Sequence, residues 1–428
     1  MNNKEKLKHI IKRIQEVSDT LSIHPTELTK ATFTKHVDDV TDWELRKFGG
    51  LAGIKRAHFP VVSKDLIQIR EQKSTSSYIN QLEKRVADKE TLETNIINLF
   101  KDFKSFKPKA NYKAKKRSRY ERELNLCLSD LHVGLHVSPE SVGHANVFNW
   151  TVASRRTAAV VRDVCNYKLD KRPEVKQLNV FLNGDLIAGI IHNIAYQNQD
   201  LLTHQLNGLM HILGNAIDTF SGNFERVKVF MQSGNHEDAL HKRHGGGRVL
   251  EEKFDSYVGP IFYALSAMFR HYKNVDFAVA TTPYMFHNSI GGRMLVTHGD
   301  ILFSKSLGNV GSSINVRGLS DAINRFNAGE IQKGNEPVKL VLFGHVHVYC
   351  DFLTFDNVRV ITNPSLSGVD GFAHSLGINS NIVGQILFET TKDYIVGDSR
   401  LIQVNHADKD ESLDKIIPPY KKQLIYEK

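Results

Sequence analysis

The chain has 428 residues, of which 41% are hydrophobic, so it is long enough for two or three domains with a sizeable core. No apolar run approaches the ~18 residues of a membrane span, and the N-terminus lacks the apolar segment of a signal peptide. We therefore expect a cytoplasmic protein without a membrane partner. Cys127, Cys165 and Cys350 have no paired spacing, which is typical of free thiols in a reducing compartment.

The excess positive charge lies in the N-terminal part of the chain. Residues 1–120 carry 26 Lys and Arg against 15 Asp and Glu, whereas the remainder carries 30 against 32. Such asymmetry favours an anionic polymer as partner, with DNA as the first candidate.

Residues 1–75 are predicted to form a small helical module. Apolar residues recur at three- and four-residue spacing over 4–21, which predicts an amphipathic helix, and shorter helices are expected near 25, over 43–48 and over 51–57. Residues 40–51 resemble the helix-turn-helix-like DNA-binding repeats found beside nucleases and recombinases, which implies DNA contacts by Arg46, Lys55 and Arg56. The alternative is a helical bundle that packs on an enzyme domain or mediates dimerisation.

Residues 76–120 are predicted to form a helix, over 77–103, and a basic linker. Residues 101–120 hold nine basic side chains and one acidic one, interleaved with aromatic residues. Such a linker can lie along phosphates, through Lys113, Lys115, Lys116 and Arg117, and add salt-dependent affinity. The alternative is a solvated tether between domains.

Five short apolar runs in residues 121–403 end in polar side chains. The runs cover 124–128, 178–182, 227–231, 294–296 and 340–343. Each is predicted to be a buried strand, and the helical patterns between them (152–167, 201–219 and 249–272) indicate an α/β domain. The polar residues stand at the carboxyl ends, where open α/β sheets carry their sites. We expect residues 301–335 to contain loops over the site and residues 404–428 to form a charged tail, poorly ordered or docked on a partner.

The polar endings supply oxygen and imidazole ligands without any thiolate. They are Asp130, His132, Asp185, Asn235, His298, His345 and His347. Seven ligands are too many for one tetrahedral ion and suit two ions that share a carboxylate. The mixture favours Mn²⁺, with Fe²⁺, Zn²⁺ or Mg²⁺ as alternatives. Two ions roughly 3.5–4 Å apart form the clamp used for displacement at phosphorus.

The motifs resemble, in order, those of the calcineurin-like metallophosphoesterase superfamily. They are Asp130-x-His132, Gly184-Asp185, Gly234-Asn235-His236-Glu237, His298-Gly299 and Gly344-His345-x-His347. The resemblance implies a four-layer α/β/β/α sandwich with two metal ions. One ion would be held by Asp130, His132 and His347, the other by Asn235, His298 and His345, with Asp185 bridging both. It further implies attack on phosphorus by a bridging hydroxide, with His236 stabilising the transition state or protonating the leaving oxygen, and with Glu237 or Asp238 orienting a neighbouring His.

Sequence features also bear on the substrate. Residues 184–189 lack the Asp-Arg-Gly continuation of protein Ser/Thr phosphatases, and residues 130–134 resemble the first motif of nuclease subunits in double-strand-break repair complexes. Together with the basic N-terminal part, they favour a DNA nuclease, acting as an exonuclease or a structure-specific endonuclease. Lys242 and Arg243, in the basic run 241–247, are candidates for steering a phosphodiester backbone. The alternative is that this run is a solvated loop.

Two other functions remain as alternatives. One is a phosphatase or phosphodiesterase acting on nucleotides or phosphoproteins, and the other is a DNA-binding accessory protein with a structural metal site. The resemblance also implies protein partners, either a second copy of the chain, through the helices at 4–21 or 77–103, or a separate ATPase or repair protein.

Overall fold

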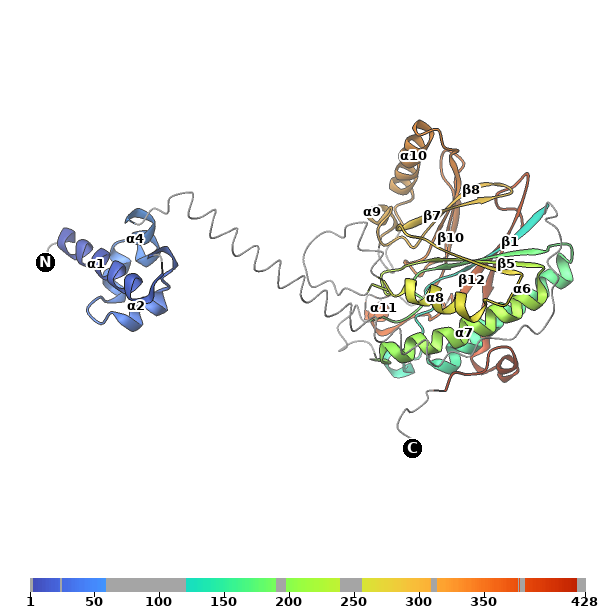
Figure 1. Ribbon diagram of the computed structural model, residues 1–428, viewed down its shortest axis with the longest axis horizontal. Helices are drawn as coiled ribbons and strands as arrows, with labels where there is room; N and C mark the ends of the chain where they lie inside the picture. Colours follow the sequence, from blue (N-terminus) through green and yellow to red (C-terminus); the bar gives the residue numbers. More distant parts are fainter. Residues whose placement is uncertain are drawn as a thin grey trace. The chain divides into compact units, whose positions relative to one another are not determined.

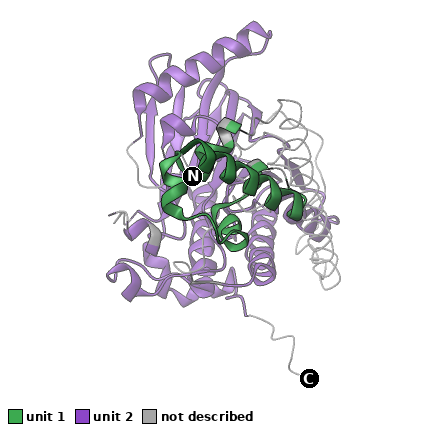
Figure 2. Cartoon of the chain, turned by 90° about the vertical axis from the view of Figure 1, so that its left-hand side faces the viewer, with its two compact units in different colours: residues 1–94 green, residues 95–428 purple. Residues whose placement is uncertain are grey.

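The computed structural model describes residues 3–23, 25–58, 121–189, 198–238, 256–308, 314–375, 377 and 382–421. They belong to two compact units, residues 1–94 and 95–428 (Figure 2). The helix predicted at 77–103, the basic linker and the boundaries expected at 75 and 120 lie outside the described residues. Within the described ranges, no helix is both long and apolar enough to cross a membrane.

The N-terminal unit is helical, as the sequence predicted. Its elements are α1 (Asn3–Leu21), the 3₁₀ helix η1 (Pro25–Glu27), α2 (Lys30–His36), α3 (Asp42–Lys47) and α4 (Gly50–His58). The Thr41 side chain accepts from the Glu44 amide at 3.3 Å, and the Glu44 carboxylate accepts from the Thr41 amide at 3.0 Å, so a capping box starts α3. Ile14, Leu28 and Phe33 are fully buried, so this unit has a core of its own.

The second unit, residues 95–428, is built around a six-stranded sheet with the order β13-β12-β1-β3-β5-β6. Its strands are β1 (Arg122–Leu128), β3 (Gln177–Asn183), β5 (Arg226–Gln232), β6 (Val275–Val279), β12 (Gly384–Thr391) and β13 (Ser399–Gln403). β1, β3, β5 and β6 are parallel, whereas β12 and β13 run antiparallel to their neighbours. The carboxyl ends of β1, β3 and β5 therefore meet at one edge of the sheet. Two short strands, β2 (Leu135–His136) and β4 (Asn198–Gln199), follow β1 and β3 in the sequence and pair with each other.

A second sheet of five strands has the order β10-β11-β9-β8-β7. Its strands are β7 (Tyr284–Ser289), β8 (Gly292–Thr297), β9 (Val338–Phe343), β10 (Cys350–Leu353) and β11 (Arg359–Thr362). Cys127 and Phe181 of the first sheet pack with Val296, Leu340 and Leu342 of the second in one buried cluster. The two sheets therefore face each other across an apolar core.

Helices cover the outer faces of both sheets (Figure 1). The first sheet carries α6 (Trp150–Lys171), α7 (Leu202–Asn223) and α8 (Val258–Met268), and the second carries α9 (Ser304–Leu307) and α10 (Val316–Gln332). This arrangement confirms the predicted α/β/β/α sandwich. The span 301–335, where loops over the site were expected, also contains α9 and α10, and α10 buries Leu319 and Ile323 against the second sheet. α8 also ends at Met268, earlier than the predicted pattern to 272.

The segment expected to be a poorly ordered or partner-docked tail is instead folded over residues 404–421. It contains the 3₁₀ helices η4 (Asn405–Lys409) and η5 (Glu411–Lys415), which pack on α6. Leu413 and Ile417 are fully buried. The charges that suggested a solvated tail are used within the fold, since Arg155 and Arg162 on α6 pair with Asp414 and Asp410.

Candidate metal centre

The seven predicted ligands meet at the carboxyl ends of the strands. Asp130 and His132 follow β1, Asp185 follows β3, Asn235 follows β5, His298 follows β8, and His345 and His347 follow β9. Three overlapping groups have ligand atoms within 4.8 Å of one another: Asp130, His132 and His347; His132, Asp185 and His236; Asp185, His298 and His345. Both sheets therefore contribute to one buried polar centre.

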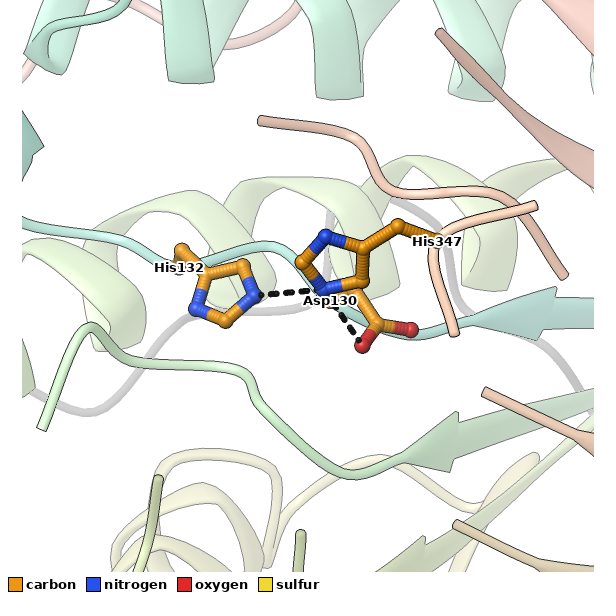
Figure 3. A group of neighbouring side chains, drawn as sticks. All are labelled: Asp130, His132 and His347. Carbon is orange, nitrogen blue, oxygen red and sulfur yellow. Dashed lines mark hydrogen bonds and ion pairs between the residues drawn. The ribbon is translucent and has the colours of Figure 1, made fainter. Parts of the chain in front are cut away.

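The first group consists of Asp130, His132 and His347 (Figure 3). His347 Nε2 lies 3.3 Å from Asp130 Oδ1 and 3.2 Å from His132 Nε2. The His345 amide donates to Asp130 Oδ1 at 3.1 Å, so the same carboxylate also ties β9 to β1. Three ligand atoms that converge at these distances are the arrangement that a single divalent cation occupies.

The second group is centred on His298, which is completely buried. His298 Nε2 lies 3.1 Å from Asp185 Oδ2 and 3.3 Å from Asn235 Oδ1. Its Nδ1 is 2.8 Å from the Asn183 carbonyl oxygen, and because a carbonyl only accepts, Nδ1 carries the hydrogen and Nε2 faces the centre. His345 Nδ1 is buried and has no hydrogen-bond partner within the part of the chain that the structure describes. A second divalent cation would satisfy it, so the residues present fit two ions.

His236 stands between the two groups. Its Nδ1 donates to the Ala188 carbonyl at 2.7 Å, and its Nε2 lies 3.8 Å from Asp185 Oδ2. The centroids of the His236 and His132 rings are 4.4 Å apart. The His236 amide donates to Asp185 Oδ1 at 2.8 Å, which holds the whole residue against the shared carboxylate.

The ligands sit on tight turns with unusual backbone conformations. Five of them have positive φ angles: Asp130 at 54°, His132 at 44°, Asp185 at 53°, His345 at 69° and His347 at 58°. Non-glycine residues in the left-handed region carry strain, and such strain is concentrated at functional sites. Two glycines let the turns approach closely, because a Cβ on Gly184 would lie 2.6 Å from the Gly234 amide and a Cβ on Gly234 would lie 2.1 Å from Asp185 Oδ1.

Glu237, one of the two residues predicted to orient a neighbouring His, instead holds these turns, and that role of Asp238 stays a prediction. The Glu237 carboxylate accepts four backbone N–H groups: Gly234 at 2.7 Å, Asp185 at 2.9 Å, Leu186 at 2.6 Å and Ile187 at 3.3 Å. Burial, reinforced by nearby Asp185, raises the pKa of Glu237 to about 7, and the N–H donors oppose that shift. The residue locks the turn after β3 to the turn after β5, and both turns carry ligands.

The charges of the centre attract cations. Burial raises the pKa of Asp185, but the His298 imidazole and its neighbours outweigh burial and hold that pKa well below its usual range. Burial lowers the pKa of His298, but Asp185 outweighs it and raises the pKa to about 10. Burial lowers the pKa of His345 to about 4. The carboxylates thus hold a proton on His298 that a divalent cation would displace.

Sequence reasoning missed the side chains that support the turn after β1. Gln385 Oε1 accepts from the Ser129 amide at 2.8 Å and from Asn363 Nδ2 at 2.8 Å, and Asn363 Nδ2 also donates to Ser129 Oγ at 2.9 Å. Asn363 directly follows β11, so its position at a strand end was an available signal. Gln385 lies inside β12, where nothing local distinguishes it.

Of the side chains predicted to contact nucleic acid, the structure describes those of Arg46 and Lys55. Arg46 Nη2 pairs with Asp42 at 2.9 Å, and Lys55 Nζ donates to the Leu28 carbonyl at 2.6 Å, with burial lowering the Lys55 pKa. Both cations are therefore already engaged within the N-terminal unit. The Arg56 side chain and the other candidates lie outside the described residues: Lys113, Lys115, Lys116, Arg117, Lys242 and Arg243.

A two-sheet sandwich with paired carboxylate–imidazole groups at its strand ends defines an α/β protein suited to two divalent cations. Residues 126–349 match the family model of the calcineurin-like phosphoesterases, and the chain belongs to that family. The family consists of phosphoester hydrolases that use dinuclear divalent metal centres. No curated protein matches the chain in sequence.

Comparison with solved structures finds matches that are distant in sequence. A hypothetical protein from Pyrococcus horikoshii OT3 is 10% identical, with 70% of this chain and 100% of that chain covered and a TM-score of 0.35. A dimetal phosphatase from Danio rerio is 10% identical, with 66% and 99% covered and a TM-score of 0.30. A 5'-nucleotidase from Candida albicans SC5314 is 11% identical, with 72% and 56% covered and a TM-score of 0.31.

Proposed function

We propose that the chain is a metal-dependent DNA nuclease, acting as an exonuclease or a structure-specific endonuclease. The observation that carries the proposal is the excess of 26 basic over 15 acidic residues in residues 1–120 of a chain that also holds a phosphoesterase centre. A hydrolase of small phosphoesters gains nothing from such charge, whereas a polyanionic substrate is attracted and retained by it.

In the proposed centre, Asp130, His132 and His347 would hold one ion, and Asn235, His298 and His345 the other, with Asp185 shared. The oxygen and imidazole ligands favour Mn²⁺, with Fe²⁺, Zn²⁺ or Mg²⁺ as alternatives. Two such cations supply a nucleophilic water at neutral pH and neutralise charge on the phosphoryl oxygens.

His236 has the proton-handling role in this proposal. With Nδ1–H fixed on the Ala188 carbonyl, its Nε2 is directed to the same space as Asp185 Oδ2, 3.8 Å away. A protonated Nε2 there donates a hydrogen bond to a non-bridging phosphoryl oxygen, or delivers a proton to the leaving oxygen. Because His236 and five of the seven ligands are buried, and His345 and His347 are half-buried, these interactions take place largely away from bulk water.

The N-terminal unit supports DNA as the substrate in this proposal. Trp43 on α3 is 67% exposed, and the Lys47 ammonium lies 5.4 Å from its ring centroid. An exposed aromatic ring beside a cation is suited to nucleic acid, where rings stack on bases and cations contact phosphates. As part of the same proposal, this unit is a helix-turn-helix-like DNA-binding module. We also place the activity inside the cell, where Cys127, Cys165 and Cys350 would stay reduced.

A substrate panel tests the proposal. The full chain would be assayed with Mn²⁺ on single- and double-stranded DNA, on a bis-aryl phosphodiester and on an aryl phosphomonoester. Cleavage of DNA and of the diester is expected to exceed monoester turnover. Monoester turnover without DNA cleavage would refute the nuclease and favour a phosphatase. Tight DNA binding with no hydrolysis of any substrate would favour an accessory protein with a structural metal site.

A further inference from the structure

A C-terminal brace, residues 404–417, lies beyond the part of the chain that matches the family model, which ends at 349. It contains η4 and η5 and packs on α6. Three arginines of α6 pair with three aspartates of the brace: Arg155 with Asp414, Arg156 with Asp408, and Arg162 with Asp410. The Arg156–Asp408 pair differs from the other two because its arginine is the least exposed of the three.

Arg156 is the most buried of these arginines, with 2% of its surface exposed. Its Nε and Nη2 donate to the two carboxylate oxygens of Asp408 at 2.8 and 2.9 Å. A bidentate pair of this kind is geometrically specific. The buried guanidinium depends on it, because an unpaired charge in the interior is strongly unfavourable.

The remaining donors of Arg156 reach a loop beside the metal centre. Nη1 donates to the carbonyls of Leu366 and Ser367 at 3.0 and 2.9 Å, and Nη2 donates to Asn146 Oδ1 at 2.9 Å. Asn146 Nδ2 in turn donates to the Ser367 carbonyl at 2.8 Å. One side chain thus fixes loop 365–367 through two of its carbonyl groups.

The same loop holds the backbone of a candidate ligand. The Leu366 amide and the Ser365 hydroxyl both donate to the Asp130 carbonyl oxygen, each at 3.1 Å. Asp130 has a φ of 54°, a strained conformation that persists only where the surroundings impose it. An unbroken series of hydrogen bonds therefore runs from Asp408 through Arg156 and Leu366 to Asp130.

We propose that Asp408 and Arg156 are positioning residues for the metal centre, and that the C-terminal brace is a working part of the site. They hold loop 365–367, the loop holds the backbone of Asp130, and the first group of ligands keeps its geometry as a result. The inference rests on the proposed function only in that the first group binds an ion. It does not depend on DNA being the substrate.

The test compares Asp408→Asn with Asp410→Asn in the full chain. Both remove one carboxylate charge from the brace, but Asp410 pairs with the half-exposed Arg162 and, within the described residues, makes no hydrogen bond to loop 365–367. Mn²⁺ binding would be followed by calorimetric titration. Asp408→Asn is expected to weaken one of two sites by about 10–100-fold, the usual effect of removing an outer-sphere partner, while Asp410→Asn matches the wild type. Wild-type affinity in Asp408→Asn, or equal weakening in both variants, would overturn the proposal.

Amide hydrogen exchange without metal gives a second readout at the loop. The Leu366 amide is expected to exchange at least about tenfold faster in Asp408→Asn than in Asp410→Asn, because its acceptor geometry loosens. If Asp408→Asn does not fold, Arg156→Lys replaces it in this measurement. The lysine keeps a positive charge beside Asp408 but cannot donate to the Leu366 and Ser367 carbonyls at the same time. Equal exchange across the variants refutes the link. Failure of the wild type to cleave DNA, with these differences intact, refutes only the nuclease.

Discussion

Replacement of Glu237 by Gln keeps the shape of the side chain and removes the charge that joins two ligand-bearing turns. In the wild type, Oε2 accepts from the amides of Asp185 and Gly234, and Oε1 accepts from those of Leu186 and Ile187. A Gln side chain has one acceptor oxygen. Whichever way its amide is turned, the NH₂ group faces two N–H donors.

Glu237→Gln therefore loses two hydrogen bonds to a charged group, each worth about 1.5–3 kcal/mol, or about 3–6 kcal/mol in sum. Burial and Asp185 raise the pKa of Glu237 to about 7, so ionised Glu237 is itself unfavourable in the folded chain. The neutral amide removes that cost. We therefore expect Glu237→Gln to lower the unfolding free energy by an amount near the lower end of that range, about 3 kcal/mol.

The assay combines urea unfolding with Mn²⁺ titration and diester hydrolysis. Glu330→Gln is the matched control, because Glu330 is a buried carboxylate on α10 that pairs with Arg293 at 2.9 Å and Lys333 at 3.0 Å. Both variants should lose stability, but only Glu237→Gln should lose Mn²⁺ affinity, by about 10–100-fold. Wild-type stability and affinity in Glu237→Gln, or an equal loss of Mn²⁺ affinity in Glu330→Gln, would refute this reasoning.

Three further predictions follow from other parts of the molecule. Gly189→Ala would place a Cβ 2.1 Å from the His236 carbonyl oxygen, at a φ of +69°, so kcat for the diester should fall more than about tenfold. The control is Gly222→Ala, which should keep the wild-type kcat because a Cβ there meets nothing within 4 Å. An unchanged kcat in Gly189→Ala would contradict the role of His236. Deletion of residues 1–120 should weaken DNA cleavage and flatten its salt dependence, with diester hydrolysis spared; equal losses on both substrates would mean that these residues support the fold. Burial, with Lys228 adding to it, lowers the pKa of His287 from 6.5 to about 4, so the unfolded chain binds more protons between those values and wild-type stability should fall as pH falls through that window. In urea unfolding, His287→Phe should reduce the loss of unfolding free energy between pH 6.5 and pH 4 by up to about 3 kcal/mol. Wild-type and His287→Phe unfolding free energies that fall in parallel with pH would contradict this prediction.

The strand endings could be predicted because their signal is local. A buried apolar run followed within three residues by Asp or His, as at Asp130 and Asp185, marks both the strand and the edge at which its ligand emerges. Parallel pairing then brings residues far apart in the chain to one place. The pairings of β1, β3 and β5 meet that expectation.

The errors fall where structure depends on distant partners. α10 was not predicted as a helix, because its Gly, Ser and Asn content obscures the stripe formed by Leu319 and Ile323, which only the second sheet makes favourable. The brace was expected as a tail because Asp408 and Asp414 look solvated until α6, some 250 residues earlier in the chain, supplies their arginines. Glu237 was placed near the site correctly, but its partners are backbone amides, whose direction depends on turns that the sequence does not specify.

The central claim is that this phosphoesterase centre, with Asp185 shared between two ions, hydrolyses DNA. The most direct measurement is cleavage of linear single- and double-stranded DNA by the full chain with Mn²⁺, beside Asp185→Asn at equal concentration. We expect cleavage by the wild type, its loss on chelation, and at least about a thousandfold slower cleavage by Asp185→Asn, because that change weakens both ion sites together. Intact DNA with the wild type, or equal cleavage by Asp185→Asn, would contradict the account.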